Sequence, residues 1–234
     1  MFAIYKRELS AYFTSTIGYI FMAVFLALSG AIVWFSSFFS ATTSFGNYFF
    51  IMIFFFIILI PILTMKLFSE ERRTKTEQIL LTSPVSLFGM VMAKFLAAMT
   101  LFEATFLLSL VNFIPVSLYG EVNIAETVSS FIGVSCVAAS LIAIGIFISS
   151  TTESQFIAAI GSIAVILVML LVGLFSSSIG NDVIRVVVKW FSILDRYVNF
   201  RYGIFDFSSI LYYISISAIF IFLTVRVFEK RRWA

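Results

Sequence analysis

Long apolar runs alternate with short polar segments along the whole chain. No aspartate, glutamate, lysine or arginine occurs from residue 9 to residue 65, a stretch long enough for two membrane-spanning helices of about 20 residues each. The pattern predicts six spans, at residues 17–39, 48–67, 88–118, 128–150, 156–178 and 210–228. The runs are continuously apolar rather than alternating at every second residue, so helices are predicted rather than the strands of a barrel.

Composition strengthens the membrane interpretation. Of the 234 residues, 62% are hydrophobic and 12% are charged, whereas an ordinary soluble domain has roughly 25% charged residues. We expect an all-α integral membrane protein, a single transmembrane domain over residues 1–234, whose 30 phenylalanines suit lipid-facing helix surfaces. The sequence has one cysteine and no histidine, which excludes an internal disulfide, histidine metal sites and histidine-based catalytic triads.

Lysine and arginine are distributed unevenly over the two sides of the predicted bundle. If the N-terminus is cytoplasmic and all six helices cross, eleven of the 15 fall on the cytoplasmic side and four on the other side. This bias predicts that both termini and the charged segment 69–84 face the cytoplasm. The first apolar run is longer than the roughly 7 to 15 residues of a signal-peptide core, so an uncleaved first helix is expected.

The segment 69–84 reads SEERRTKTEQILLTSP and lies between two of the most apolar stretches of the chain. Thr74 and Glu77 match a capping box, which predicts a short helix over residues 75–82. Ser83-Pro84 would end this helix, because proline disfavours helix at the residue before it. Two interpretations stay open, namely a solvated loop with cationic anchors at the inner surface and a docking element for a cytoplasmic partner.

Two further stretches have amphipathic helical patterns. In residues 1–14, Phe2, Tyr5, Leu9 and Tyr12 share one face, which predicts a helix along the inner leaflet or, more simply, a basic flank of the first span. Residues 183–197 predict an extracytoplasmic amphipathic helix, with a seventh, irregular span as the alternative. Such a helix could form a lid or rim over an exit, or it could merely seal the bundle.

Glu103 lies inside the third predicted span. An ionised carboxylate in a bilayer costs several kcal/mol unless it is paired or hydrated. It is therefore a candidate for a role in a transport pathway, with a structural hydrogen bond to a neighbouring helix as the alternative. The fourth span contains several small residues, including Gly133 and Gly145, and these favour close helix packing rather than a substrate site.

Three stretches together resemble a known family. They are KRELSAYFTSTIGYI near the N-terminus, PILTMKLFSEERRTKTEQILLTSPVSLFGMVMAKFLA in the centre, and FRYGIFDFSSILYYISISAIFIFLTVRVFEKRRW at the C-terminus. In this order they are similar to the permease subunit of ABC-2 type transporters, in the branch with gliding-motility and nitrous-oxide-reductase-maturation permeases. The resemblance covers essentially the whole chain.

The resemblance implies a six-helix permease of the type V exporter kind in the cell inner membrane, with both termini cytoplasmic. It implies that the chain binds two copies of a cytoplasmic ATPase and pairs with a second permease copy or a homologous permease. As in some relatives, an accessory membrane-anchored subunit with an external domain is a further implied partner. The chain lacks the GxxxxGK[ST] phosphate loop, so ATP and Mg²⁺ are expected on the ATPase; no cofactor, catalytic residue or nucleic-acid partner is expected for this chain.

The family's coupling helix falls on the segment between the second and third spans, and its connecting helix falls on residues 1–14 with Arg7 and Glu8 as a charged pair. The coupling positions carried over are Glu70, Glu71, Arg72, Thr76, Glu77, Leu80, Leu81, Ser83 and Pro84. The expected function is export of an apolar or amphipathic substrate, such as a lipid or peptide, by alternating access at a permease dimer interface. The alternative is a membrane anchor that couples an ATPase to a larger envelope machine without moving a small substrate.

Overall fold

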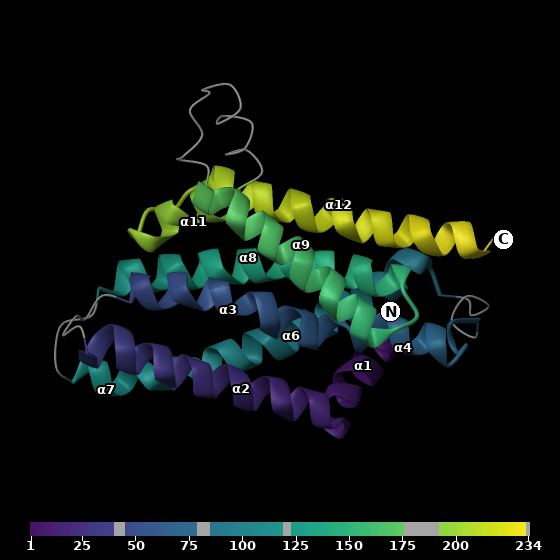
Figure 1. Ribbon diagram of the computed structural model, residues 1–234, viewed down its shortest axis with the longest axis horizontal. Helices are drawn as coiled ribbons and strands as arrows, with labels where there is room; N and C mark the ends of the chain where they lie inside the picture. The colour runs from purple at the N-terminus through teal and green to yellow at the C-terminus, as the bar shows by residue number, and fades with distance from the viewer. Residues whose placement is uncertain (40–44, 79–84, 119–122, 176–191, 233–234) are drawn as a thin grey trace.

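The computed structural model is helical throughout the part of the chain that it describes, which comprises residues 1–39, 45–78, 85–118, 123–175 and 192–232 (Figure 1). Within these ranges there is no β-strand. Six helices are long and apolar enough to cross a membrane. They confirm the six predicted spans and the multi-pass membrane character of the chain.

The helices extend beyond the predicted spans at several ends. The first span is α2 (Thr16–Val33), which continues into the π-helical η1 (Trp34–Phe39), and it follows the short helix α1 (Phe2–Thr14). The remaining elements are α3 (Gly46–Thr64), α4 (Lys66–Arg73), α6 (Leu87–Ser109), η2 (Leu110–Phe113), α7 (Ile114–Ser117), α8 (Ile124–Thr151), α9 (Gln155–Phe175), α11 (Ile193–Arg201) and α12 (Phe207–Arg232).

Polar residues fix where several of these helices begin. The side chains of Ser86, Asn123 and Ser192 accept hydrogen bonds from backbone amides in the first turns of α6, α8 and α11, which satisfies amides that have no partner inside the helix. This capping explains why α8 begins at Ile124, four residues before the predicted start of the fourth span at residue 128.

The turn between α1 and α2 depends on Gly18. Ser15 is extended between the two helices, and a Cβ atom on Gly18 would overlap the carbonyl oxygen of Tyr12. Because this obstacle is backbone rather than a mobile side chain, it cannot move aside without opening the turn.

We therefore expect Gly18→Ala to loosen α1 from the bundle, at a cost of about 1–3 kcal/mol, the usual range for overpacking. Hydrogen exchange of the amides of α1 should become faster in the variant, while exchange in α8 should be unchanged. Unchanged exchange in α1 would contradict the role assigned to this glycine.

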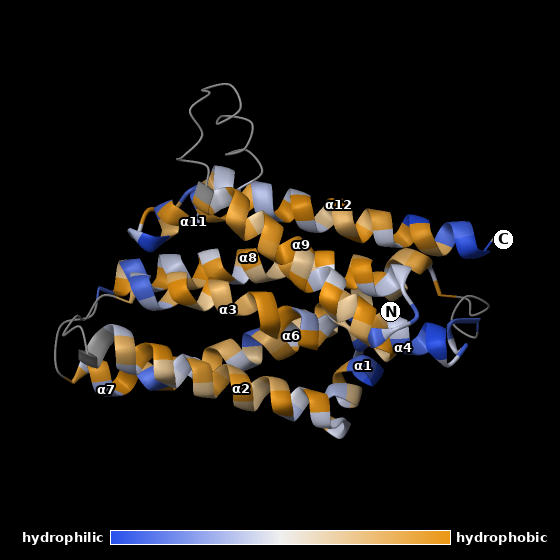
Figure 2. Cartoon of the chain, viewed as in Figure 1, coloured by the Kyte–Doolittle hydropathy of each residue, from blue (hydrophilic) through white to orange (hydrophobic). Residues whose placement is uncertain are grey.

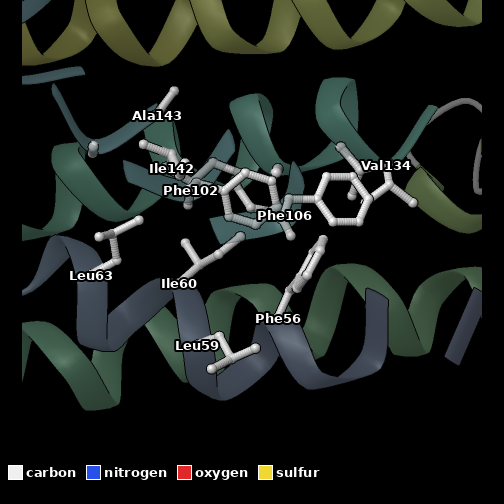
Figure 3. Close-up of a cluster of buried hydrophobic side chains, with 14 of the residues drawn as sticks. Phe56, Leu59, Ile60, Leu63, Phe102, Phe106, Val134, Ile142 and Ala143 are labelled. Carbon is white, nitrogen blue, oxygen red and sulfur yellow. The ribbon is translucent and has the colours of Figure 1, made fainter. Parts of the chain in front are cut away.

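Aromatic residues form the centre of the bundle. Phe102 and Phe106 of α6 lie between α3, which contributes Phe56, and α8, which contributes Val134 (Figure 3), and all four side chains are 0% exposed. The rings of Phe56 and Phe102 meet edge to face, with centroids 5.3 Å apart, a geometry that adds about 0.5–1.5 kcal/mol to burial alone. The expectation that the phenylalanines serve lipid contact is thus wrong for many of them, because the core itself is built from them.

Small residues bring α8 against its neighbours, as the sequence predicted. A Cβ atom on Gly133 would lie 2.8 Å from the side chain of Phe200 in α11, and one on Gly145 would overlap Thr64 in α3. Close approach of this kind gives helices in a membrane the van der Waals contact that replaces a hydrophobic driving force.

Different helices and chain termini lie at the two ends of the bundle. Both termini lie at the end where α4 is found, whereas α7 and α11 lie at the opposite end (Figure 1). Hydrophilic residues concentrate at these ends and hydrophobic residues fill the length between them (Figure 2). This arrangement is the one expected of an even number of crossings.

The predicted amphipathic helix at 183–197 is described only from residue 192 onwards; its residues 183–191 lie outside the described part. In the described part, α11 is tightly packed, with Tyr197 and Phe200 0% exposed. Ser130 of α8 donates to the Phe200 carbonyl at 3.1 Å, and Tyr213 of α12 donates to the Ile193 carbonyl at 2.8 Å. These contacts favour the sealing role over a mobile lid for residues 193–201.

Candidate functional site

α4 carries the charged run that follows the second span. Leu67 and Phe68 are buried against the bundle, whereas Arg73 is exposed. The helix ends at Arg73, after which Lys75 takes a φ of 60°, in the left-handed region that does not continue an α-helix. The predicted helix start at residue 75 is therefore wrong, because residues 66–73 are already helical and helical structure resumes only at Glu77.

The predicted capping box does not form as expected. The hydroxyl of Thr74 donates to the Glu70 carbonyl at 2.9 Å, so it serves the end of α4. The carboxylate of Glu77 pairs with Arg231 at 3.1 Å. In a capping box it would instead have accepted a hydrogen bond from the backbone amide of Thr74. The remainder of the predicted helix, residues 79–82, lies outside the described residues.

Lys94 of α6 is the centre of a buried ion cluster. Its side chain is 1% exposed, and its Nζ lies 3.1 Å from Glu8 Oε1 and 2.9 Å from Glu71 Oε1. The same ammonium donates to the Leu67 carbonyl at 2.8 Å and lies 5.0 Å from the centroid of the Phe68 ring. A buried ammonium requires such partners, because an isolated charge away from water is strongly destabilising. Lys94 thereby joins α1, α4 and α6.

Arg7 completes the cluster. Its Nη2 lies 2.6 Å from Glu8 Oε1 and 2.9 Å from Glu71 Oε1, so the four side chains carry two positive and two negative charges. Burial lowers the pKa of Arg7, but the hydrogen bonds and charges of Glu8 and Glu71 outweigh this and hold it above the ordinary value. The predicted pair of Arg7 and Glu8 is thus present, and it contacts α4 directly through Glu71.

A cavity of about 460 Å³ lies next to this cluster, between α1 and α4. Residues from both helices and from the start of α2 line it, together with Lys94. The lining residues include Arg7, Glu8, Tyr12, Ser15, Lys66, Glu70, Glu71, Thr74 and Thr76.

A second set of contacts ties α4 to the C-terminal end of α8. Arg72 donates to the Thr151 carbonyl at 2.8 Å and pairs with Glu153 at 3.0 Å. The last carbonyls of a helix have no partner inside the helix and carry partial negative charge, so an arginine there is doubly favourable. Arg72 therefore fixes the position of α8 relative to α4.

Arg231, near the end of α12, makes a parallel contact. It donates to the Ser150 carbonyl at 2.5 Å and pairs with Glu77 at 3.1 Å. The C-terminal end of α8 is thus held by one arginine from α4 and one from α12.

We expect Arg231→Gln to destabilise this end of the protein by about 1.5–3 kcal/mol, the usual value of charge-assisted hydrogen bonds. Hydrogen exchange at the C-terminal end of α8 should increase. Arg226→Gln is the matched control. Arg226 is 61% exposed, its ion pair within the described part of the chain is with Glu229, one turn away, and its guanidinium lies 4.9 Å from the centroid of the Phe222 ring. Exposed contacts of this kind are weak, so the loss should cost about 1 kcal/mol or less. Equal effects of the two variants would contradict the importance of the Arg231 contact.

Two further predicted coupling residues, Glu70 and Thr76, lie near the ion cluster but outside it. Glu70 pairs with Lys66 at 3.7 Å on the partly exposed side of α4, and Thr76 donates to the Glu71 carbonyl at 3.3 Å. Leu80, Leu81, Ser83 and Pro84 lie outside the described residues. The structure therefore brings Glu71, Arg72 and Glu77 into contact with four other helices, α1, α6, α8 and α12, whereas Glu70 pairs within α4.

Glu103 lies far from this cluster. It is nine residues beyond Lys94 on α6, which is about 14 Å along the axis at roughly 1.5 Å per residue. The residue is half-buried, and its carboxyl group lies beside Ser135 of α8. This position places it within the apolar part of the bundle, as the sequence predicted.

Sequence reasoning missed Lys94 and Arg231 as members of the site. It counted Lys94 only among the cations of the cytoplasmic side, although a lone lysine in the apolar stretch VMAKFLA is a signal that a buried partner must exist. Arg231 carried no such signal, because a basic C-terminal run is ordinary for a helix that ends at a membrane surface.

The chain matches no model of a known protein family, and no curated protein is similar to it in sequence. In the described part of the chain, no three histidine, cysteine, aspartate or glutamate side chains lie together as a metal site would require. The geometry of the charged end is thus the main guide to function.

Proposed function

We propose that this chain is the permease subunit of an ATP-driven transporter of the ABC-2 type, located in the inner membrane with both termini cytoplasmic. The observation that carries the proposal is the position of α4, which follows the second span and is bonded to α1 and α6 through Lys94 and to α8 through Arg72. An element bonded to several spans can pass a displacement on to them.

The proposed mechanism follows from these contacts. A cytoplasmic ATPase binds the segment 69–84, and its closure on ATP and Mg²⁺ shifts α4. Because the ion cluster links α4 to α1 and α6, and the two arginines link α4 and α12 to α8, the shift moves packed helices between discrete arrangements. Two permease copies then alternate access at their interface to export an apolar or amphipathic substrate.

The proposal is tested by purifying the tagged chain from its native host in mild detergent and identifying co-purifying proteins by mass spectrometry. A stoichiometric ATPase with a phosphate loop is expected, and the double variant Leu80→Asp/Leu81→Asp should lose it. Leu118→Asp, at an exposed position of the opposite end, is the matched control and should retain it. Retention of the ATPase by the double variant would count against docking on this segment.

The same preparation separates transport from anchoring. Reconstituted into vesicles that contain a fluorescent phosphatidylethanolamine, a lipid exporter should move the probe between leaflets when ATP is supplied. An ATPase that binds stoichiometrically but moves neither this lipid nor a fluorescent apolar peptide would favour the anchor function.

A further inference from the structure

Carboxylates and cations are unevenly matched at the end of the bundle that holds both termini. Each acidic side chain described there forms an ion pair within the chain, and these are Glu8, Glu70, Glu71, Glu77, Glu153 and Glu229. They pair with six of the eleven cations of this end. The other five cations are exposed and pair with no carboxylate among the described residues; they are Lys6, Arg73, Lys75, Lys230 and Arg232.

The ends of α4 and α12 meet at this end of the bundle, where both are hydrophilic (Figure 2). The rings of Phe68 in α4 and Phe228 in α12 have centroids 4.7 Å apart. The ion pair of Glu77 and Arg231 joins the segment after α4 to the last turn of α12, so the cations beside this pair in both segments share one surface. We call this surface the cationic platform, and it comprises Arg73, Lys75, Lys230 and Arg232.

The cationic platform stands beyond the apolar part of the helices. Lys66 is the first charged residue after the second span, and Arg73 lies seven residues farther along the same helical stretch, about 10 Å at roughly 1.5 Å per residue. Arg226 is the first charged residue of α12, and Arg232 lies six residues farther, about 9 Å on the same rise. The headgroup layer on each side of a bilayer is about 5–8 Å thick. The platform therefore faces water, where a soluble partner can reach it.

Lys6 differs from the cations of the platform. It shares the exposed face of α1 with Phe2 and Phe13, which are 76% and 43% exposed. Aromatic residues beside a lysine on one helix face favour the membrane interface. Lys6 is thus a matched control for the platform, because it is an unpaired lysine at the same end of the bundle that lies against lipid rather than water.

Charge complementarity indicates the partner of the platform. Exposed charges act over about 8 Å at physiological salt, and no described carboxylate of this end is left to neutralise these four. We propose that the cationic platform binds an acidic surface of the ATPase, which makes the end of α12 a second docking element beside the segment 69–84. This inference rests on the proposed function, because it names where the same partner binds and by which chemistry.

A docked α12 would also complete the mechanical connection to the bundle. Arg231 lies between Lys230 and Arg232 in the sequence and donates to the Ser150 carbonyl at the C-terminal end of α8. An ATPase that holds both α4 and α12 therefore acts on α8 from two sides, through Arg72 and through Arg231.

The test uses the full chain purified together with its ATPase. A water-soluble carbodiimide joins a lysine amine to a carboxylate as an amide and takes up the water that is released, and the cross-linked peptides are mapped by mass spectrometry. Lys75 and Lys230 should be cross-linked to aspartate or glutamate residues of the ATPase, whereas Lys6 should not.

Charge reversal measures the contribution of the platform to binding. With the chain in phosphatidylcholine nanodiscs, Lys230→Glu should weaken binding of the purified ATPase about tenfold, because it replaces attraction by repulsion. Lys6→Glu should change the affinity less than about twofold, because an exposed charge away from the interface contributes little. Replacing the cross-linked carboxylate of the ATPase by lysine should restore binding to the Lys230→Glu variant.

Two results would overturn the proposal while leaving the proposed function intact. One is an ATPase that is recovered but is cross-linked to neither Lys75 nor Lys230. The other is a Lys230→Glu chain that binds the ATPase as tightly as the Lys6→Glu chain; if this variant instead loses contact with spin-labelled phosphatidylglycerol in phosphatidylcholine vesicles, the platform serves anionic lipid. Failure to recover any ATPase would contradict the proposed function, and the docking surface with it.

Discussion

Replacing Lys94 by methionine should destabilise the protein by about 3–5 kcal/mol, the usual cost of removing one partner from a buried ion pair. Of the described cations, the loss leaves Glu8 and Glu71 with Arg7 alone, and it removes the hydrogen bond to the Leu67 carbonyl. Methionine retains most of the apolar stem of lysine, so the loss of stability mainly measures the loss of the charge. A fall in the thermal unfolding midpoint of the detergent-solubilised protein measures it.

Two further variants make this prediction specific. Lys6→Met removes a lysine from an exposed position on α1 and should leave the midpoint nearly unchanged. Glu71→Gln combined with Lys94→Met should be less destabilising than the sum of the two single variants, because residues in direct contact are not additive. Additive effects would show that Lys94 and Glu71 do not stabilise each other.

The same cluster offers a functional readout if the proposed ATPase is present. Lys94→Met should retain the ATPase, because the docking segment 69–84 is unaltered, but ATP hydrolysis should no longer move substrate. A variant that loses the ATPase altogether would place Lys94 in docking rather than in transmission.

Gly145→Ala should destabilise the protein by about 1–3 kcal/mol, because overpacking a tight helix contact forces backbone or side-chain shifts. The new Cβ would overlap Thr64 Oγ1 and would lie 3.0 Å from Thr64 Cβ. Thr64 is 0% exposed, and its hydroxyl donates to the Ile60 carbonyl, so it has little freedom to move. Separation of α3 from α8 should lower the thermal unfolding midpoint in detergent.

Gly30→Ala is the matched control for this effect. Gly30 also lies in a spanning helix, but the nearest atom to its Cβ would be Asn112 Oδ1 at 3.9 Å, an ordinary van der Waals contact. Alanine is favoured over glycine in helices by up to about 1 kcal/mol, so this variant should be neutral or slightly stabilised. The combination of Thr64→Ala with Gly145→Ala should recover part of the loss. A Gly145→Ala protein as stable as the control would rule out close packing as the reason for this glycine.

The number and kind of the spanning helices could be predicted from the sequence because they depend on local properties. A run of about 20 apolar residues satisfies its backbone hydrogen bonds only as a helix in a bilayer, and this holds whatever the neighbouring helices are. The predicted ends of the helices were less accurate. The start of α8, for example, is set by the cap at Asn123. The capping box at Thr74 and Glu77 failed because Arg231, distant in sequence, competes for Glu77.

The candidate site depended far more on tertiary structure. The sequence placed Arg7, Glu8 and Glu71 in two separate charged segments and gave no reason to join them. Lys94 joins them because its side chain reaches from α6 to a carboxylate of α1 and a carboxylate of α4, with its Nζ 3.1 Å from Glu8 and 2.9 Å from Glu71.

The sequence by itself therefore determined that this protein is a bundle of six apolar helices with a charged segment after the second, since hydrophobicity and helical periodicity are properties of each stretch alone. Only the tertiary structure decided which charges meet and which phenylalanines form the core. These features depend on how helices that are distant in sequence pack together, and the burial of each charge is set by the partners that packing supplies.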